Sequence, residues 1–241
     1  FALTSAVMGK KKLIRFKENA TFARLFEPPA LELLEKDHHL KGHWAKNFFA
    51  NDNDLKLELG CGRGEYTVEL ARMFPEQNFI GIDIKGSRLY FGVKAVQNEN
   101  LNNACFVRTQ IELINRIFAR EVSEIWVTFP DPFPERAHRR LTSPAFLNRY
   151  LDILRDDGAI CLKTDHFELF EFTRKIAIDN SLEITAETSD LYGSELIEKL
   201  PPVQTTYEKR FLEEGKKICF LRFKLNKAVK PLPKKINKSK D

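Results

Sequence analysis

The stretch Leu57-Glu58-Leu59-Gly60-Cys61-Gly62-Arg63-Gly64-Glu65 decides the fold expected of this chain. The apolar residues at 55–59 predict a short strand, which the polar run 51–54 bounds upstream. Downstream, apolar residues recur at helical spacing until Pro75, so a helix is expected to begin just after the glycines. Glycines let a backbone approach a ligand closely, and a helix N-terminus offers free N–H groups. The sequence therefore predicts a ligand-binding turn between a strand and a helix.

A carboxylate after the next strand indicates which kind of ligand this turn binds. That strand is expected at 78–84, with Asp83 near its end. In doubly wound folds, an acid about 20 residues beyond the glycine turn bonds a ribose hydroxyl. Glu58 would repel a pyrophosphate but attract a cation. S-adenosylmethionine carries a sulfonium and an ammonium group and no phosphate, so it is favoured over NAD; an incidental glycine-rich turn is the minority interpretation.

Strands and helices alternate through the core of the chain, which predicts an α/β fold with a mostly parallel sheet and helices on both faces. The segment 30–49 is expected to hold one helix, and 191–206 is expected to be a loop because it has little periodicity. Seven strands are expected, at 55–59, 78–84, 104–109, 124–128, 159–163, 182–188 and 218–225, with further helices at 87–98, 111–118, 143–154 and 167–178.

Polar residues follow five of the expected strands. They are the glycine turn 60–64, Asp83, Gln110, Asp131 and Asp165. In an open α/β sheet, ligands bind outside the carboxyl ends of the strands. We therefore expect these residues to form one rim.

A rigid, proline-rich loop is expected at Phe129-Pro130-Asp131-Pro132-Phe133-Pro134. Its prolines fix φ and remove N–H donors, so the loop is suited to aiming the carboxylate of Asp131. Its two aromatic rings offer faces on which a base can stack. A basic group suited to phosphates follows: Arg136, His138, Arg139, Arg140 and Arg149. The alternative is a proline-rich connector followed by solvated charges.

Length and charge suggest one domain with basic arms. The 241 residues suit a single α/β domain, and 39 basic less 34 acidic residues give a net charge of +5. We expect a methyltransferase domain at 51–225 between a basic, aromatic extension at 8–50 and a basic tail at 226–241. Residues 1–7 are expected to be an expression-vector remnant. Basic arms on a nearly balanced core suggest a polyanionic partner, with solubilising tails as the alternative.

Cysteine and histidine usage predicts a cytoplasmic protein without metal. Four cysteines lie far apart and are expected to be buried, reduced thiols: Cys61, Cys105, Cys161 and Cys219. His38, His39 and His43 lack the Cys or acidic partners of a metal site, so they are expected to be solvated or to face RNA. No apolar run approaches the roughly 18 residues of a membrane span. The oligomeric state, monomer or homodimer, stays open.

Motifs along the chain resemble those of the tRNA (guanine-N7)-methyltransferase family. In order, they are Glu58-Leu-Gly-Cys-Gly-Arg-Gly64, Gly81-Ile-Asp83, Phe129–Pro134 followed by Arg139-Arg140-Leu141, Lys163-Thr-Asp165 and Thr205-Thr-Tyr-Glu208. The resemblance covers residues 55 to 223. The Pro-Asp-Pro-Phe-Pro loop and the late Thr-x-x-Glu are specific to that family, whereas the glycine turn is generic to class I methyltransferases.

The resemblance implies a Rossmann-like class I methyltransferase that methylates N7 of the variable-loop guanosine of tRNA, position 46 in standard tRNA numbering. It implies a catalytic role for Asp131. Cofactor contacts are implied for Glu58, Asp83, Gln110 and Asp131, beside Gly60, Gly62 and Gly64 of the turn. Substrate contacts are implied for Asp165, Thr205 and Glu208. Two departures stand out: Gln110 replaces an Asp or Asn common among relatives, and Glu135 replaces a frequent Lys, so Arg136 is expected to supply that basic contact.

The expected chemistry is a direct in-line displacement, because N7 of guanine carries a free lone pair and needs no deprotonation. Asp165 and Glu208 are expected to accept hydrogen bonds from guanine N1–H and N2–H₂, which adenine lacks. Three alternatives remain: a small-molecule methyltransferase, a methyltransferase acting on an exocyclic amine of a nucleic-acid base, and an RNA-binding protein that has lost catalysis. A dehydrogenase is disfavoured by the glycine pattern.

Overall fold

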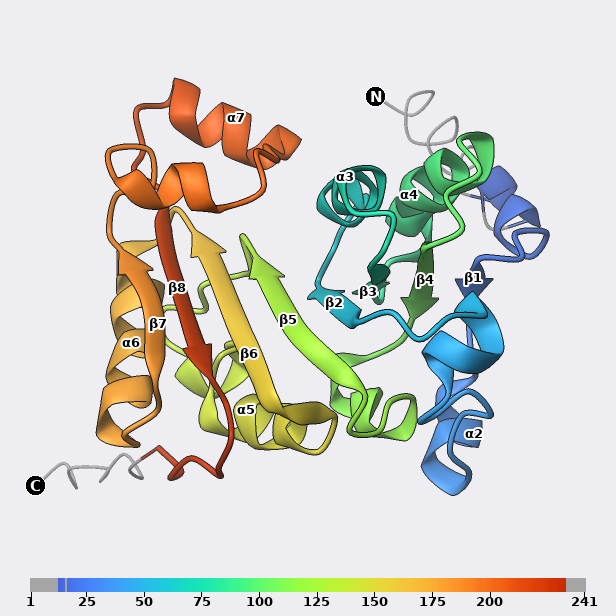
Figure 1. The fold of residues 1–241 in the computed structure, drawn as a ribbon, viewed down its shortest axis with the longest axis horizontal. Helices are drawn as coiled ribbons and strands as arrows, with labels where there is room; N and C mark the ends of the chain where they lie inside the picture. Colours follow the sequence, from blue (N-terminus) through green and yellow to red (C-terminus); the bar gives the residue numbers. More distant parts are fainter. Residues whose placement is uncertain (1–12, 16, 233–241) are drawn as a thin grey trace, which may run out of the picture.

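The computed structural model describes residues 13–15 and 17–232. Within them, the strands form one eight-stranded sheet in the order β1-β4-β3-β2-β5-β6-β8-β7 (Figure 1). Their bounds are β1 Leu25–Phe26, β2 Leu55–Leu59, β3 Asn78–Asp83, β4 Ala104–Arg108, β5 Val122–Thr128, β6 Leu154–Thr164, β7 Ile184–Thr188 and β8 Cys219–Lys224. Only β8 runs antiparallel to its neighbours, β6 and β7. The mostly parallel α/β sheet predicted from the sequence is confirmed, with the short strand β1 added at one edge.

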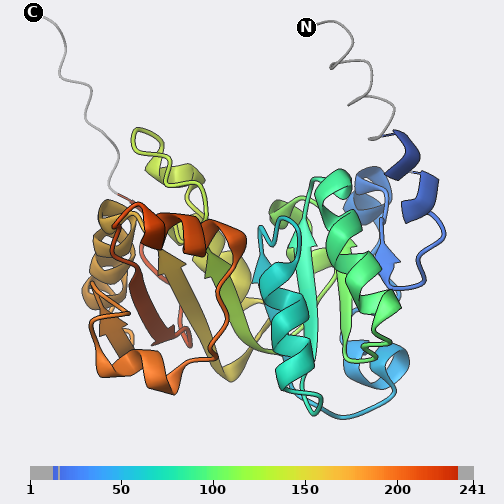
Figure 2. The same ribbon diagram turned by 90° about the horizontal axis from the view of Figure 1, so that it is seen from above.

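Helices pack on both faces of the sheet, each over its own apolar core (Figures 1 and 2). Helices α3, α4 and α7 contribute to one core; α2, α5 and α6 contribute to the other. The α-helices are α2 Ala30–Glu35, α3 Glu65–Met73, α4 Gly86–Asn98, α5 Pro144–Leu151, α6 Phe167–Asp179 and α7 Thr206–Glu213. Short 3₁₀ segments lie at Ile111–Arg116 (η2), Ala137–Arg139 (η3) and Glu195–Lys199 (η4), and a π-helical segment lies at Trp44–Phe49 (η1).

Close packing around one aromatic ring seats the glycine turn on the sheet. A Cβ atom added at Gly64, Gly81 or Gly92 would lie 2.4–2.5 Å from the ring of Phe106. Only glycine allows this approach, so the turn, β3 and α4 all press against a single side chain of β4. This packing fixes the position of the turn at the start of α3.

Three elements differ from the sequence prediction. The segment 30–49 holds two short helices, α2 and η1, rather than one. Strand β6 begins at Leu154 rather than at 159, which shortens the preceding helix. The expected loop at 191–206 contains η4 and leads into α7. This helix is short, and its few apolar residues did not suffice to predict it. The described residues exclude the expected vector remnant at 1–7, residues 8–12 of the basic extension and most of the basic tail.

The four cysteines are buried and unpaired, as the sequence predicted. Burial raises the pKa of each thiol. His38 is half-buried rather than fully solvated: its ring stacks on Trp44, and burial lowers its pKa to about 4. Between residues 13 and 232, residue 16 aside, no helix is long and apolar enough to cross a membrane, and no three His, Cys, Asp or Glu side chains gather as metal ligands.

Candidate active site

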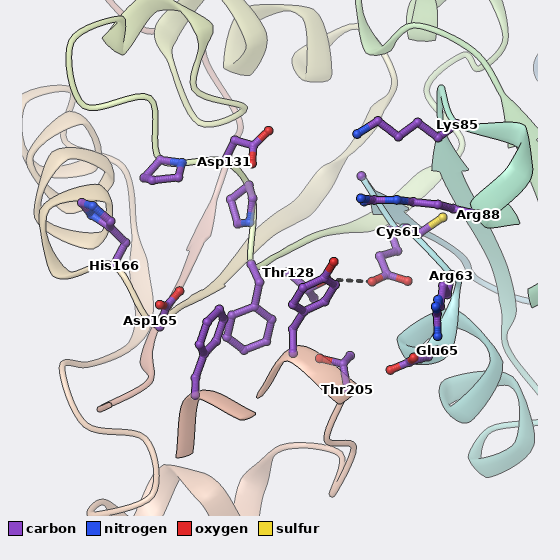
Figure 3. A pocket seen from close by; sticks show the side chains of 18 of the residues that line it. Cys61, Arg63, Glu65, Lys85, Arg88, Thr128, Asp131, Asp165, His166 and Thr205 are labelled. Atoms are coloured by element: carbon purple, nitrogen blue, oxygen red, sulfur yellow. Dashed lines mark hydrogen bonds between the residues drawn. The ribbon is translucent and has the colours of Figure 1, made fainter. Parts of the chain in front are cut away.

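A cavity of about 420 Å³ lies at the carboxyl ends of the neighbouring strands β2 and β5 (Figure 3). The strand order reverses at this point, which is where open α/β sheets bind ligands. Three chain segments supply most of its wall: the glycine turn, the proline loop and the start of α7. Figure 1 shows α7 at the carboxyl ends of β5 and β6. Of the five strand ends predicted to form one rim, three line this cavity: the glycine turn, Asp131 and Asp165.

The cavity wall contains about half of the residues predicted for the site. Those on the wall are Glu58, Gly60, Gly62, Asp131, Asp165 and Thr205. Among the described residues, those predicted for the site but not on the wall are Gly64, Asp83, Gln110, Arg136 and Glu208. Wall residues to which the sequence analysis gave no role include Glu65, Lys85, Arg88, Thr128, His166, Phe211 and Lys216.

Glu58, near the end of β2, is a carboxyl group with three hydrogen-bond donors around it. It accepts from Thr67 N at 3.0 Å and Thr67 Oγ1 at 2.5 Å, and from Thr128 Oγ1 at 2.7 Å. Only 4% of the residue is exposed. Burial raises the pKa of Glu58 to about 7, although the three donors favour the charged form. The carboxyl group of Glu58 is therefore close to the midpoint of its ionisation at neutral pH, and a cation in the cavity would favour its charged form.

Asp83 helps to hold the glycine turn, whose three glycines adopt left-handed conformations. Gly60, Gly62 and Gly64 have φ values of 71°, 58° and 74°. Asp83 accepts from Gly62 N at 2.9 Å and from Lys85 N at 2.7 Å. Its carboxylate therefore lies directly behind two wall residues and fixes the backbone that faces the cavity.

The proline loop places Asp131 between two residues with strained backbones. Phe129 and Phe133 have φ values of 47° and 38°, in a region that costs an aromatic residue about 1–3 kcal/mol. Two hydrogen bonds keep the loop in this conformation: Phe129 N donates to Lys163 O at 2.8 Å, and Arg140 Nε donates to Pro132 O at 2.8 Å. The exposed carboxylate of Asp131 is thereby aimed at the cavity (Figure 3).

The basic group after the loop divides into two kinds of side chain. Arg140 is only 6% exposed, and its guanidinium lies 4.4 Å from the ring centre of Phe172. It supports the loop and is not free to bind phosphate, contrary to the prediction for the group as a whole. Arg136, His138 and Arg139 are exposed.

Charges of opposite sign face each other across the cavity. Asp131 and Asp165 lie on one side, and Lys85 and Arg88 on the other (Figure 3). Asp165 pairs with Lys216, whose Nζ lies 3.1 Å from Oδ2. The acidic side is thus partly neutralised at the end of β6.

The N-cap and one face of α7 line the cavity with Thr205, Tyr207 and Phe211, which we call the α7 wall. The Thr205 side chain caps the helix by accepting from Glu208 N at 3.2 Å. Helical spacing places Tyr207 and Phe211 on one face, where both reach the cavity.

Glu208 lies beneath this wall. It is fully buried (0% exposed), and Lys163 Nζ, 3% exposed, lies 2.6 Å from its Oε1. Tyr192 also donates to Oε1, at 2.8 Å. Burial lowers the pKa of Lys163, and the neighbouring carboxylate opposes that shift. Glu208 thus joins α7 to β6 through Oε1, whereas its buried Oε2 has no hydrogen-bond partner among the described residues; its contact with guanine stays a prediction.

Comparisons with known proteins identify the family. The family model described as "Putative methyltransferase" matches residues 52–221. The tRNA (guanine-N(7)-)-methyltransferase of Christiangramia forsetii is 49% identical over 221 residues, which is 90% of this chain and 99% of that protein. The chain belongs to this family. The protein of the same name from Bacteroides thetaiotaomicron is 45% identical over 90% of this chain and 87% of its own length.

Solved structures with low identity share the fold of this family member. The structure titled "Structure of an Antibiotic Related Methyltransferase" superimposes with a TM-score of 0.57 at 18% identity, covering 78% of this chain and 95% of its own. The 16S rRNA methyltransferase KamB gives a TM-score of 0.55 at 16% identity, covering 72% and 88%. The Rossmann-like class I methyltransferase fold expected from the sequence is confirmed.

The cavity fits S-adenosylmethionine, the methyl donor of the family. Its volume falls within the range of small-molecule sites. A Cβ added at Gly62 would meet nothing within 4 Å, so this part of the turn faces open space. Glu58 beside it supplies a carboxyl group whose charged form suits a cationic ligand. Glu58 and the turn would therefore hold the cofactor.

The affinity for S-adenosylmethionine is expected to rise with pH through about pH 7. The folded-state pKa of Glu58 lies above its ordinary value of 4.5, so the carboxyl group is largely protonated below pH 7. If the cation binds the carboxylate form, Kd should fall about tenfold between pH 6 and pH 8. Calorimetric titration at a series of pH values measures this change.

Glu58→Gln is the matched control for this titration. This variant removes the titratable carboxyl group. The amino group of the ligand, which titrates in a similar pH range, is present in both experiments. The difference between wild type and variant isolates Glu58. The same pH dependence in both proteins would contradict the assignment.

Proposed function

We propose that this protein transfers a methyl group from S-adenosylmethionine to N7 of a guanosine in tRNA, namely position 46 in the variable loop. The observation that carries the proposal is one cavity with two unlike sides. The glycine turn and Glu58 form a cofactor side, and Asp131, Asp165 and the α7 wall form an acidic, aromatic side. Family membership, with relatives of that printed name at 45–49% identity, supports the same reaction.

The acidic, aromatic side matches the chemistry of guanine. Guanine N1–H and N2–H₂ are donors, and Asp165 offers acceptor oxygens at the cavity wall. Phe129, Tyr207 and Phe211 supply rings against which a base can stack. A guanosine that enters must leave its own stack, so tRNA shape contributes to recognition. We assign base recognition to this side, with Thr205 at its edge.

The reaction depends on positioning and on charge. Bound S-adenosylmethionine supplies an electrophilic methyl group, and N7 attacks it without prior loss of a proton. Holding the reactants in line can lower the barrier by ~7–11 kcal/mol. Asp131 orients the reacting groups and stabilises the positive charge that develops on the purine. Asp83 holds the glycine turn through Gly62 N; a cofactor contact of Gln110 rests on the family resemblance alone.

The exposed cations after the proline loop would bind the tRNA backbone. Arg136 and Arg139 are both exposed, and they lie at the N-cap and the last position of the η3 turn that follows the proline loop. We assign phosphate contacts to them. Reduced thiols support a cytoplasmic location, and nucleophilic attack by N7 requires no metal.

Labelled S-adenosylmethionine and unmodified bulk tRNA test the function. We expect label in 7-methylguanosine after nucleoside digestion, and none in a tRNA transcript with adenosine at position 46. Label in an exocyclic-amine product would favour a different base methyltransferase. No label in tRNA, despite cofactor binding, would overturn the proposal.

A further inference from the structure

Two hydrogen bonds join the opposite sides of the cavity. Glu65, the first residue of α3, accepts from Thr206 N at 2.5 Å and from Thr206 Oγ1 at 2.8 Å. The partners are 141 positions apart in the sequence. Glu65 directly follows the glycine turn, whereas Thr206 stands between Thr205 and Tyr207 of the α7 wall. Figure 3 shows Glu65 close to Thr205 at the rim.

The contact has a clear physical basis. The first N–H groups of a helix have no partner within it, and the helix dipole makes this end positive. Thr205 satisfies Glu208 N from within the segment, and Glu65 satisfies Thr206 N from another element. A carboxylate of the cofactor side thus completes the cap of the helix that forms the substrate side.

We propose that Glu65 is a positioning residue: the Glu65–Thr206 pair is a clasp that sets the distance between the glycine turn and the α7 wall. Glu208 and Lys163 anchor α7 from below, and the clasp fixes its rim. The gap between turn and wall admits the guanosine. This consequence for catalysis rests on the proposed function, whereas the clasp itself does not.

Two variants break the clasp from opposite sides. Glu65→Ala removes the acceptor, and Thr206→Pro removes both donors. Proline suits the first position of a helix, and Thr205 before it already has the extended backbone that proline requires (φ −71°, ψ 162°). Glu69→Ala is the matched control, because Glu69 lies one turn along α3 and pairs with Arg72 outside the cavity.

Each single variant is expected to lower kcat/KM for tRNA about three- to tenfold, as for the loss of an acid at a helix N-terminus. The Kd for S-adenosylmethionine should change less than about twofold, since the glycine turn stays seated on Phe106. The double variant should be no worse than either single variant. Glu65→Gln should recover most of the activity, because its amide oxygen still accepts. Additive losses in the double variant would mean that Glu65 acts directly on a ligand, which overturns the clasp.

A second readout needs no activity. Trypsin should cleave α7 after the exposed Lys209 and Arg210 faster in Glu65→Ala and Thr206→Pro than in wild type or Glu69→Ala. Unchanged cleavage would overturn the clasp. Faster cleavage in a protein that does not methylate tRNA would support the clasp and reject the proposed function.

Discussion

Replacing Asp131 by alanine is expected to lower the rate of methyl transfer to tRNA at least about hundredfold. Asp131 is an exposed carboxylate on the cavity wall, held between two prolines and two strained phenylalanines. Its loss removes a preorganised charge from the side of the cavity on which positive charge develops. Single-turnover transfer from labelled S-adenosylmethionine measures the rate, and calorimetry checks that the Kd of the cofactor rises much less.

Glu135→Ala is the matched control for this experiment. Glu135 carries the same charge four residues further along the same loop, is exposed and lies outside the cavity wall. It should retain nearly full activity. If both variants lost the same activity, the effect would come from the charge of the loop rather than from Asp131. An Asp131→Ala protein with normal activity would contradict the catalytic role of Asp131.

Replacing Glu208 by alanine is expected to lower the free energy of unfolding by about 3–5 kcal/mol. The variant leaves Lys163 buried and without its carboxylate partner, and it removes the acceptor of Tyr192. Urea denaturation measures the loss. The paired change Lys163→Met with Glu208→Leu should cost less than Glu208→Ala, because no charge then stays buried.

Glu213→Ala serves as the control, since Glu213 is an exposed glutamate at the end of the same helix. Its effect should stay within about 0.5 kcal/mol. A Glu208→Ala protein that is as stable as wild type, but methylates without preference for guanine, would contradict the anchor. It would instead support the direct base contact implied by the family resemblance.

The framework of the site could be predicted from sequence because its signals are local. The strand, glycine turn and helix at 55–73 follow from apolar spacing within a few residues of each turn. The convergence of Asp131 and Asp165 with that turn follows from a general rule for parallel sheets. No long-range contact had to be known.

The side of the cavity assigned to the base could be predicted only in part, because it depends on partners far apart in the chain. Arg139 and Arg140 are neighbours in sequence, yet only Arg140 is buried, by contacts with Pro132 and Phe172. In the sequence, Glu208 is only a polar residue of a short motif. Its burial depends on Lys163, which lies in β6, much earlier in the chain. Helix α7 has too few apolar residues to be recognised by periodicity.

The position of β8 has a consequence for how the protein is made. Strand β8 follows β7 along the chain but lies between β6 and β7 in the sheet. Strand β7 is therefore joined to the sheet through β8. During synthesis, the strands from β2 to β5 can pair as soon as they leave the ribosome, whereas β7 must wait for residues 219–224. The nascent chain thus completes its cofactor side first. Its sheet is complete only when β8 lies between β6 and β7.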